Sequence, residues 1–170
     1  LELPVSRVEA RIESLQEFNP MLGLRGVRLG VTIPEIYEMQ ARAIFEAALK
    51  ASRRNAPPVE PEIMIPLVSA RREVELVKAR IDAIAAEVSA KRKKQFKYRL
   101  GVMVETPRAA LRAGEIAENA EFLSFGTNDL TQMTYGLSRD DAGRFMSNYV
   151  QQGVFAEDPF QQLDIDGVGE

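Results

Sequence analysis

The sequence predicts an α/β fold in which repeated strand–helix units build a parallel sheet. Short apolar runs alternate along the chain with longer stretches whose apolar residues recur at helical spacing. The run at residues 100–105 is almost continuously apolar, as expected for a strand buried on both faces of a parallel sheet. The units repeat roughly every 35 residues, which is long enough for the right-handed crossover that joins parallel strands.

Four units of this kind follow one another. The expected strands are residues 23–29, 62–68, 100–105 and 122–125. Four units are compatible with a small open sheet, or with half of an eight-unit barrel that normally needs about 250 residues. Periodicity alone leaves both architectures open.

The expected helices follow these strands. The first runs through residues 35–54, with Thr32 as its N-cap and Pro34 in its first turn, and residues 55–58 end it. Its predicted apolar face consists of Ile36, Met39, Ala43 and Ala47.

The second expected helix begins after Ser69, which is a candidate cap. Its predicted buried stripe consists of Val74, Val77, Ile81, Ile84 and Val88. Thr106 and Pro107 begin a third helix that extends to about residue 120. The polar, glycine-containing tail after the fourth strand is expected to form loops and short helices.

Composition excludes several classes of protein. The 170 residues are 45% hydrophobic and 28% charged, which is typical of a globular domain. No apolar run approaches the roughly 20 residues of a membrane-spanning helix. The chain has no Cys and no His, which excludes disulfides, thiolate chemistry and catalysis by imidazole within these residues. Any chemistry must rely on carboxylates, Arg, Lys, amides, hydroxyls or a metal held by oxygen.

Residues 91–99 are strongly basic and contain two aromatic residues, Phe96 and Tyr98. Such a run can bind RNA. The net charge of −3 gives the whole chain no attraction for nucleic acid, however. The run also lies where basic residues stabilise the end of the preceding helix. We therefore expect a solvated helix end and loop, and no nucleic-acid partner.

The clearest functional signal lies at the ends of the last two strands. Glu105 ends one strand, and Asn128 and Asp129 lie just beyond the next. The carboxyl ends of parallel strands share one edge of the sheet, where α/β proteins bind ligands, so these side chains should converge. Arg25 would reach the same edge from the first strand if its side chain points that way.

This combination of residue types suits a hard cation and an anion. Mg²⁺ commonly takes one or two carboxylates and completes its coordination with water and substrate oxygens. Arg25 offers a planar fork for phosphate or carboxylate, and Gly126 allows backbone amides around Thr127 to approach an anion. A structural interpretation stays open, because a strand-end Glu can be a surface or capping residue and Gly-Thr-Asn-Asp makes a good turn. Arg28 and Arg42 are interpreted as structural ion-pair or surface residues.

Longer motifs around these residues resemble the phosphoenolpyruvate (PEP)-binding barrel of the PEP-utilizing enzymes. They occur in the family's order and cover nearly the whole chain. They are NPMLGLRGVRLG at 19–30, EIMIPLV at 62–68, GVMVETPR at 101–108 and SFGTNDLTQ at 124–132.

Further motifs are similar to the pyruvate, phosphate dikinase branch of that family. These are PEIYEMQARA at 34–43, SRDDAGRF at 138–145, DPF at 158–160 and GVG at 167–169. PEP synthase and the sugar phosphotransferase Enzyme I are related alternatives, and Enzyme I differs after the Thr-Gln that follows the fourth strand. A non-catalytic module that binds Mg²⁺ and an anion is a further alternative.

The resemblance implies an activity, a cofactor and a set of site residues. The branch converts ATP, pyruvate and phosphate into AMP, PEP and diphosphate, and this part would handle the PEP/pyruvate half-reaction with Mg²⁺. By the match, Glu105 and Asp129 are Mg²⁺ ligands, and Arg25 binds the transferring phosphoryl group. Asn128 and the backbone of Gly126 and Thr127 contact the substrate. Arg139 matches a phosphate-binding Arg of Enzyme I.

Departures from the family pattern imply that residues 1–170 are a fragment of the PEP/pyruvate-binding barrel, from the third to the sixth strand. The earlier arginine-bearing strands are missing, as is the later strand loop with the Cys that protonates the enolate. The implied partners are pyruvate or PEP, the swivelling phosphohistidine domain and the ATP-binding domain of the parent chain, and a second copy in a homodimer. We expect no membrane partner and a cytoplasmic location, or a plastid if the parent comes from a plant. The fragment alone is expected to be inactive.

Overall fold

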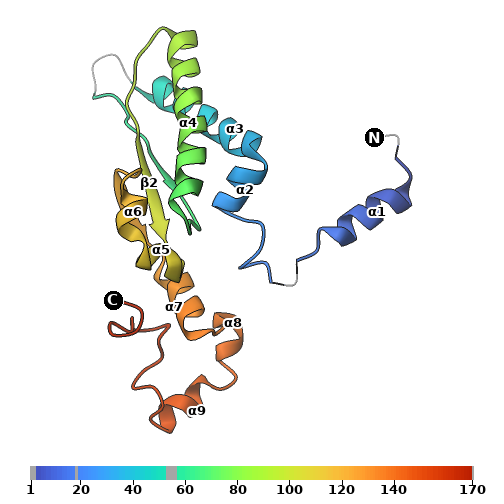
Figure 1. Cartoon of the computed structure of the whole chain (residues 1–170), viewed down its shortest axis with the longest axis vertical. Coiled ribbons are helices and arrows are strands. Elements are labelled where there is room, and N and C mark those ends of the chain that lie inside the picture. The colour runs from blue at the N-terminus through green and yellow to red at the C-terminus, as the bar shows by residue number, and fades with distance from the viewer. Residues whose placement is uncertain (1–2, 18, 53–56, 170) are drawn as a thin grey trace.

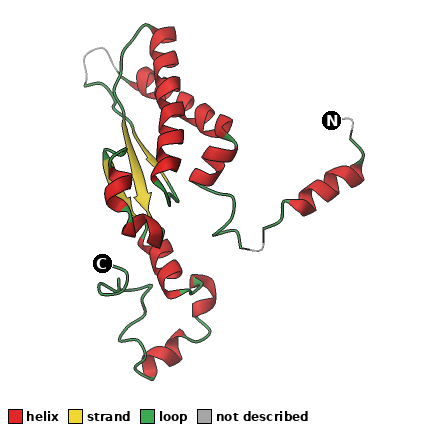
Figure 2. Ribbon diagram, in the orientation of Figure 1, coloured by secondary structure: helices red, strands yellow, loops and turns green. Residues whose placement is uncertain are grey.

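A parallel sheet of three strands forms the centre of the molecule. The computed structural model describes residues 3–17, 19–52 and 57–169. The strands are β1 (Glu62–Ile65), β2 (Arg99–Val104) and β3 (Phe122–Phe125), paired in the order β1-β2-β3 (Figure 2). Both pairs are parallel, with Met64 opposite Gly101 and Gly101 opposite Phe122. Three of the four predicted strands are thus confirmed: β3 has the predicted bounds, β2 lies one residue earlier than predicted, and β1 ends at Ile65 and not at Val68.

Helices alternate with these strands and continue after them (Figure 1). They are α1 (Val5–Ser14), α2 (Val27–Thr32), α3 (Pro34–Ala51), α4 (Arg71–Arg92), α5 (Pro107–Leu111), α6 (Ala113–Ala117), α7 (Thr127–Tyr135), α8 (Arg139–Ala142) and α9 (Met146–Gln151). The tail after β3 consists of loops and short helices, as predicted. No helix among the described residues is both long and apolar enough to cross a membrane.

The predicted first strand at 23–29 is wrong. Residues 23–26 form turns, and α2 begins at Val27. Gly26 has a φ of 57°, and a Cβ there would lie 2.8 Å from the Cβ of Leu67. This left-handed turn, which glycine adopts easily, brings the backbone against the end of β1, where the Val27 N–H donates to the Pro66 carbonyl at 3.0 Å. The segment therefore contacts the end of the sheet without joining its ladder.

One face of the sheet carries the hydrophobic core. Ile65, Val102 and Val104 are fully buried on this face, and residues of α2 to α6 pack over it. The predicted stripe of α4 is buried along its whole length, which confirms the helical spacing. Its members are Val74, Val77, Ile81, Ile84 and Val88.

The opposite face of the sheet is covered less completely. Gly101 is buried because the Phe122 ring lies against it, whereas Met64 on the neighbouring strand is 38% exposed. The apolar run of β2 predicted burial on both faces. Among the described residues, helices cover only one of them.

The buried face of α3 is not the one predicted. Met39 is 59% exposed, whereas Ala41, Phe45 and Ala48 are buried. Phe45 packs against Phe96 and Tyr98, with ring centroids 4.9 Å apart in both pairs. The aromatic residues of the basic run therefore face the core.

Capping residues fix where several helices begin. The Thr106 hydroxyl accepts a hydrogen bond from the Ala109 N–H at 3.2 Å, and Pro107 occupies the first turn of α5, as predicted. Thr32 does not cap α3: it ends α2 and donates to the Arg28 carbonyl. The start of α4 is held by Glu73, whose carboxylate accepts from the N–H groups of Ser69 and Ala70.

Two other helical predictions need correction. The single helix expected after Thr106 is broken at Arg112 into α5 and α6. The first long helix ends at Ala51, and residues 53–56, where its end was predicted, lie outside the described residues.

Candidate metal and anion site

Glu105 follows β2 at the carboxyl edge of the sheet and is only 5% exposed. Its Oε1 accepts a hydrogen bond from the Leu67 N–H, just beyond β1. Leu67 has a φ of 60°, a left-handed conformation that is rare for a residue with a branched side chain. Such strain is retained where the surrounding structure enforces it. Here the strained residue is the one whose N–H donates to the buried Glu105 carboxylate.

Gly126 makes room for this carboxylate on the β3 side. Its N–H donates to the Val104 carbonyl at 2.9 Å, which extends the pairing of β2 and β3 by one residue. A Cβ at Gly126 would lie 2.6 Å from the Cβ of Glu105 and 2.8 Å from its Oε2. The absence of a side chain at Gly126 therefore accommodates the Glu105 carboxylate, and the predicted approach of an anion to the backbone amides stays a prediction.

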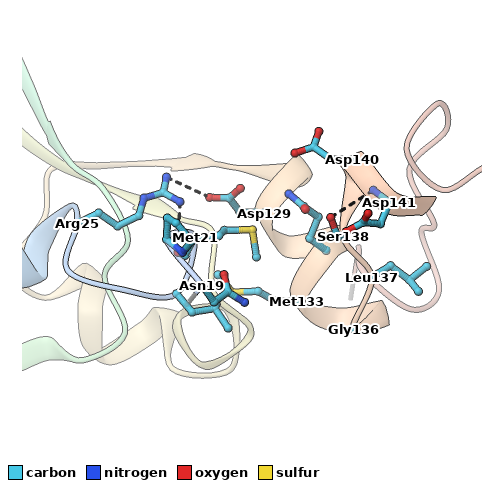
Figure 3. Close-up of a pocket in the computed structure, with 13 residues that line it drawn as sticks. Asn19, Met21, Arg25, Asp129, Met133, Gly136, Leu137, Ser138, Asp140 and Asp141 are labelled. Atoms are coloured by element: carbon cyan, nitrogen blue, oxygen red, sulfur yellow. Dashed lines mark hydrogen bonds and ion pairs between the residues drawn. The ribbon is translucent and has the colours of Figure 1, made fainter. Parts of the chain in front are cut away.

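Asp129 lies in the first turn of α7, which begins directly after Gly126. Its Oδ2 is 3.7 Å from an Arg25 Nη, and its side chain is 14% exposed. Arg25 also donates to the Met21 carbonyl at 3.3 Å (Figure 3). Although the strand predicted to carry Arg25 does not form, the turn at Gly26 brings Arg25 to the expected edge of the sheet.

Asn128 links Asp129 to Arg139. Its Nδ2 donates to Asp129 Oδ1 at 3.3 Å, and its Oδ1 accepts from Arg139 Nη1 at 2.8 Å. Arg139, the first residue of α8, is held by a second hydrogen bond from its own N–H to Gln132 Oε1 at 2.9 Å. Thr127 is exposed at the start of α7, where first-turn N–H groups have no partner within the helix.

A broad pocket of about 1010 Å³ opens beside the ion pair of Arg25 and Asp129 (Figure 3). Met21, Met133 and Leu137 line it together with acidic residues of α8. A smaller cavity of about 170 Å³ is lined by Asn128 together with Thr127 and Arg139. Arg25 and Asp129 thus line the larger pocket and Asn128 lines the smaller one, whereas the buried Glu105 lines neither of these two.

The charges of the site favour a bound cation. Burial raises the pKa of Glu105, the Leu67 N–H opposes this, and the negative charge of Asp129 raises the pKa further, against the effect of Arg25. Two carboxylates held close together in a buried setting repel each other, and a divalent cation between them would relieve this repulsion.

The donor set suits Mg²⁺. No cluster of three or more acidic side chains that could hold a metal occurs among the described residues. Mg²⁺ requires only one or two protein carboxylates, because water and substrate oxygens complete its octahedron. Glu105 and Asp129 meet that requirement, with the Asn128 amide nearby.

The structure adds positioning groups that the sequence did not reveal. The Leu67 N–H, the Met21 carbonyl and the Gln132 amide contact the predicted site residues directly. Two of these act through the backbone, for which residue type gives no signal. Gln132 is the last residue of the SFGTNDLTQ motif at 124–132, and its place in that motif is the only feature of the sequence that points to a role at the site. Arg28 donates to the carbonyls of Leu22 and Gly23, and Arg42 pairs with Glu87, so both have the structural roles predicted.

The parallel sheet, with acidic, amide and guanidinium groups at its carboxyl edge, defines an α/β protein suited to phosphorylated or carboxylate ligands. The family model described as "PEP-utilising enzyme, PEP-binding domain" matches residues 2–168, and the chain belongs to this family.

Relatives from bacteria and plants support this assignment. The chain is 55% identical over 170 residues, its full length, to pyruvate, phosphate dikinase of Rhizobium meliloti, of which it covers 19%. It is 49% identical over 168 residues to pyruvate, phosphate dikinase of Clostridium symbiosum, covering 99% of this chain and 19% of the relative. It is also 55% identical over 161 residues to the maize protein "Pyruvate, phosphate dikinase 1, chloroplastic", covering 95% of this chain and 17% of the relative. The chain thus spans about a fifth of the length of these relatives.

Proposed function

We propose that this chain binds PEP and pyruvate with Mg²⁺ and serves the PEP/pyruvate half-reaction of a pyruvate, phosphate dikinase. The whole reaction interconverts ATP, pyruvate and phosphate with AMP, PEP and diphosphate. The observation that carries the proposal is the convergence of Glu105, Asp129 and Arg25 at the carboxyl edge of the sheet. This convergence occurs in a chain of the PEP-binding family whose relatives are dikinases.

Each residue has a distinct role in this proposal. Glu105 and Asp129 hold Mg²⁺, which when bound supplies positive charge next to the substrate oxygens. Arg25 lies on the Asp129 side of the pair, where its guanidinium can bind the phosphoryl oxygens of PEP. Asn128 and the N–H groups at the start of α7 orient the substrate, and Arg139 provides a further positive charge for phosphate.

These groups suit the charge that develops during the reaction. Loss of the phosphoryl group from PEP leaves the enolate of pyruvate, whose oxygen becomes more negative as the bond breaks. Donors and cations that are already in place stabilise such charge without having to reorganise. Phosphoryl transfer relies mainly on this kind of positioning and electrostatic stabilisation.

We further propose that residues 1–170 form part of a (β/α)₈ barrel in a longer enzyme. The three parallel strands would be the fourth, fifth and sixth of the barrel, and the less covered sheet face with Met64 would line its interior. Within the longer protein the partners are a swivelling phosphohistidine domain, an ATP-binding domain and a second copy. Its location is the cytoplasm, or the plastid in a plant.

Binding of oxalate, which mimics the pyruvate enolate, tests the proposed site by calorimetry. The chain should bind oxalate only when Mg²⁺ is present. Replacing both Glu105→Gln and Asp129→Asn should abolish this Mg²⁺-dependent binding, because the variant has lost both of the carboxylates that would hold the cation. Glu87→Gln is the matched control, because Glu87 pairs with Arg42 on the surface and should leave binding unchanged. Equal Mg²⁺-dependent binding by the double variant would contradict the proposed metal site, and binding without Mg²⁺ would favour a metal-free anion module.

A further inference from the structure

A segment of the C-terminal tail lies against the guanidinium of Arg139. The Cζ of Arg139 is 6.0 Å from the centroid of the Phe160 ring, within the range of a cation–π interaction. Phe160 belongs to the DPF motif at 158–160, to which the proposed function gives no role. Pro159 of the same motif is buried.

The tail is built to hold this ring in place. An Asp158 carboxylate oxygen accepts from the Phe160 N–H at 2.9 Å, and the Asp158 carbonyl accepts from the N–H groups of Gln161 and Gln162. This turn fixes the backbone on both sides of the ring.

A second attachment joins the tail to α7. The Tyr135 hydroxyl donates to Asp164 Oδ2 at 2.5 Å, and the Tyr135 ring packs edge-on against Phe155 at 5.3 Å. Tyr135 is the last residue of the helix whose first turn carries Asn128 and Asp129. The tail is therefore anchored to the element that presents the candidate site.

The contacts continue from the ring to the acidic pair. Arg139 donates to Asn128 Oδ1, and Asn128 donates from its Nδ2 to Asp129, which is paired with Arg25. Donation from Arg139 to Oδ1 settles which way the Asn128 amide faces, because only the carbonyl side can accept. The Nδ2 group is then directed to Asp129.

We infer that Phe160 is a positioning residue that holds Arg139 on Asn128 and so keeps the Asn128 amide directed to Asp129. This inference rests on the proposed function for its consequence in binding. The contact itself is independent of any ligand. Arg139 and Phe160 also line the 170 Å³ cavity together with Leu163, which provides a control on the same cavity.

Side-chain NMR of the chain tests the contact directly. Relative to the wild type, Phe160→Leu should move the Arg139 Nε–H signal toward that of a free arginine and shift the Asn128 side-chain amide pair. Phe160→Tyr keeps an aromatic face and should restore both signals, and Leu163→Ala should leave them unchanged. Signals that do not respond to Phe160→Leu, or that respond equally to Leu163→Ala, would overturn the inference.

Oxalate affinity in the presence of Mg²⁺ tests the consequence. A partly exposed cation–π contact corresponds to a change of roughly two- to five-fold, so Phe160→Leu should weaken binding by about that factor. Adding Phe160→Leu to Arg139→Gln should weaken binding no further than Arg139→Gln alone, because the ring acts through Arg139. Fully additive losses would contradict this coupling. If wild-type chain binds no oxalate, the proposed function fails, whereas the NMR comparison still decides the positioning role.

Discussion

Burial of Glu105 makes its charge a determinant of both stability and binding. Because the pKa of Glu105 is raised in the folded chain, folding favours the protonated form. The contribution of this group to stability is complete below its unfolded pKa. That contribution is lost as the pH rises through the raised, folded-state value.

The sign of this effect gives the first prediction at the residue scale. Mg²⁺ needs the ionised carboxylate, so its affinity should increase as the pH rises through the raised pKa of Glu105. In the absence of metal, Glu105→Gln should stabilise the chain at neutral pH, since Gln can still accept from the Leu67 N–H without a buried charge. Calorimetric titrations with Mg²⁺ at increasing pH check the change in affinity, and thermal melts of both chains at neutral pH check the change in stability. A Glu105→Gln chain that melts lower than the wild type at neutral pH without metal would contradict them.

Gly126 gives a second prediction at this scale. Gly126→Ala places a methyl group 2.6 Å from the Cβ of Glu105, and neither the strand ladder nor the buried carboxylate can move far. We expect a loss of about 1–3 kcal/mol in the free energy of unfolding, as for other overpacked sites. Urea denaturation measures it. Gly114→Ala is the matched control: nothing outside α6 lies within 4 Å of the added methyl group, and the change should stabilise the chain by up to about 1 kcal/mol.

At the residue scale, the sequence predicts side-chain chemistry well and backbone geometry poorly. Glu105, Asp129 and Arg25 carry charge that residue type reveals, and the structure brings these three together at the predicted edge. The Leu67 N–H is part of the same arrangement only because Leu67 adopts a positive φ. No property of a leucine in a sequence indicates that conformation.

At the scale of elements, the local sequence pattern predicts a helix and its buried face correctly where only one arrangement fits the pattern. The stripe of α4 and the Thr-Pro start of α5 each have a single reasonable interpretation, and both are confirmed. Helix α3 offers two apolar stripes. Contacts from Phe96 and Tyr98, about 50 residues away in the chain, decide that the Phe45 stripe is buried.

Segment 23–29 fails for a related reason. Its apolar residues suit either a short strand or a helix, and the pattern cannot distinguish them over so few residues. A strand also needs a partner, and β1 is paired only with β2 among the described residues. The turn at Gly26 and the hydrogen bond from Val27 to Pro66 then favour the helix.

The α4 stripe supports a prediction about stability at this scale. Ile81 is 1% exposed in the centre of the core, so Ile81→Ala should lower the free energy of unfolding by about 2–5 kcal/mol. Leu76→Ala removes an aliphatic side chain from the same helix at a position that is 38% exposed, and should cost much less. Denaturant unfolding followed by circular dichroism compares the two. Equal losses would mean that α4 does not pack on the sheet as described.

At the scale of the whole molecule, the incomplete covering of the sheet predicts how the chain behaves in solution. Helices cover one face of a three-stranded sheet, and both outer strands have an edge without a partner among the described residues. Open edges and partly exposed apolar residues such as Met64 favour association between copies. Sedimentation velocity should therefore show association that increases with protein concentration. A strictly monomeric chain at all concentrations would contradict this expectation.

The proposed half-reaction requires groups that these 170 residues do not contain. The proposed half-reaction moves a phosphoryl group between PEP and a histidine, and a separate acid must protonate the enolate. The chain has no His and no Cys, so it has neither the phosphoryl acceptor nor the thiol that the family resemblance implies. We therefore expect Mg²⁺-dependent oxalate binding but no formation of PEP or pyruvate by the purified chain. A coupled assay for pyruvate release from PEP measures this directly. Turnover that disappears in the Glu105→Gln, Asp129→Asn variant would show that residues within the chain can replace the missing groups. It would refute the proposal that other parts of a longer enzyme supply the phosphoryl acceptor and the acid.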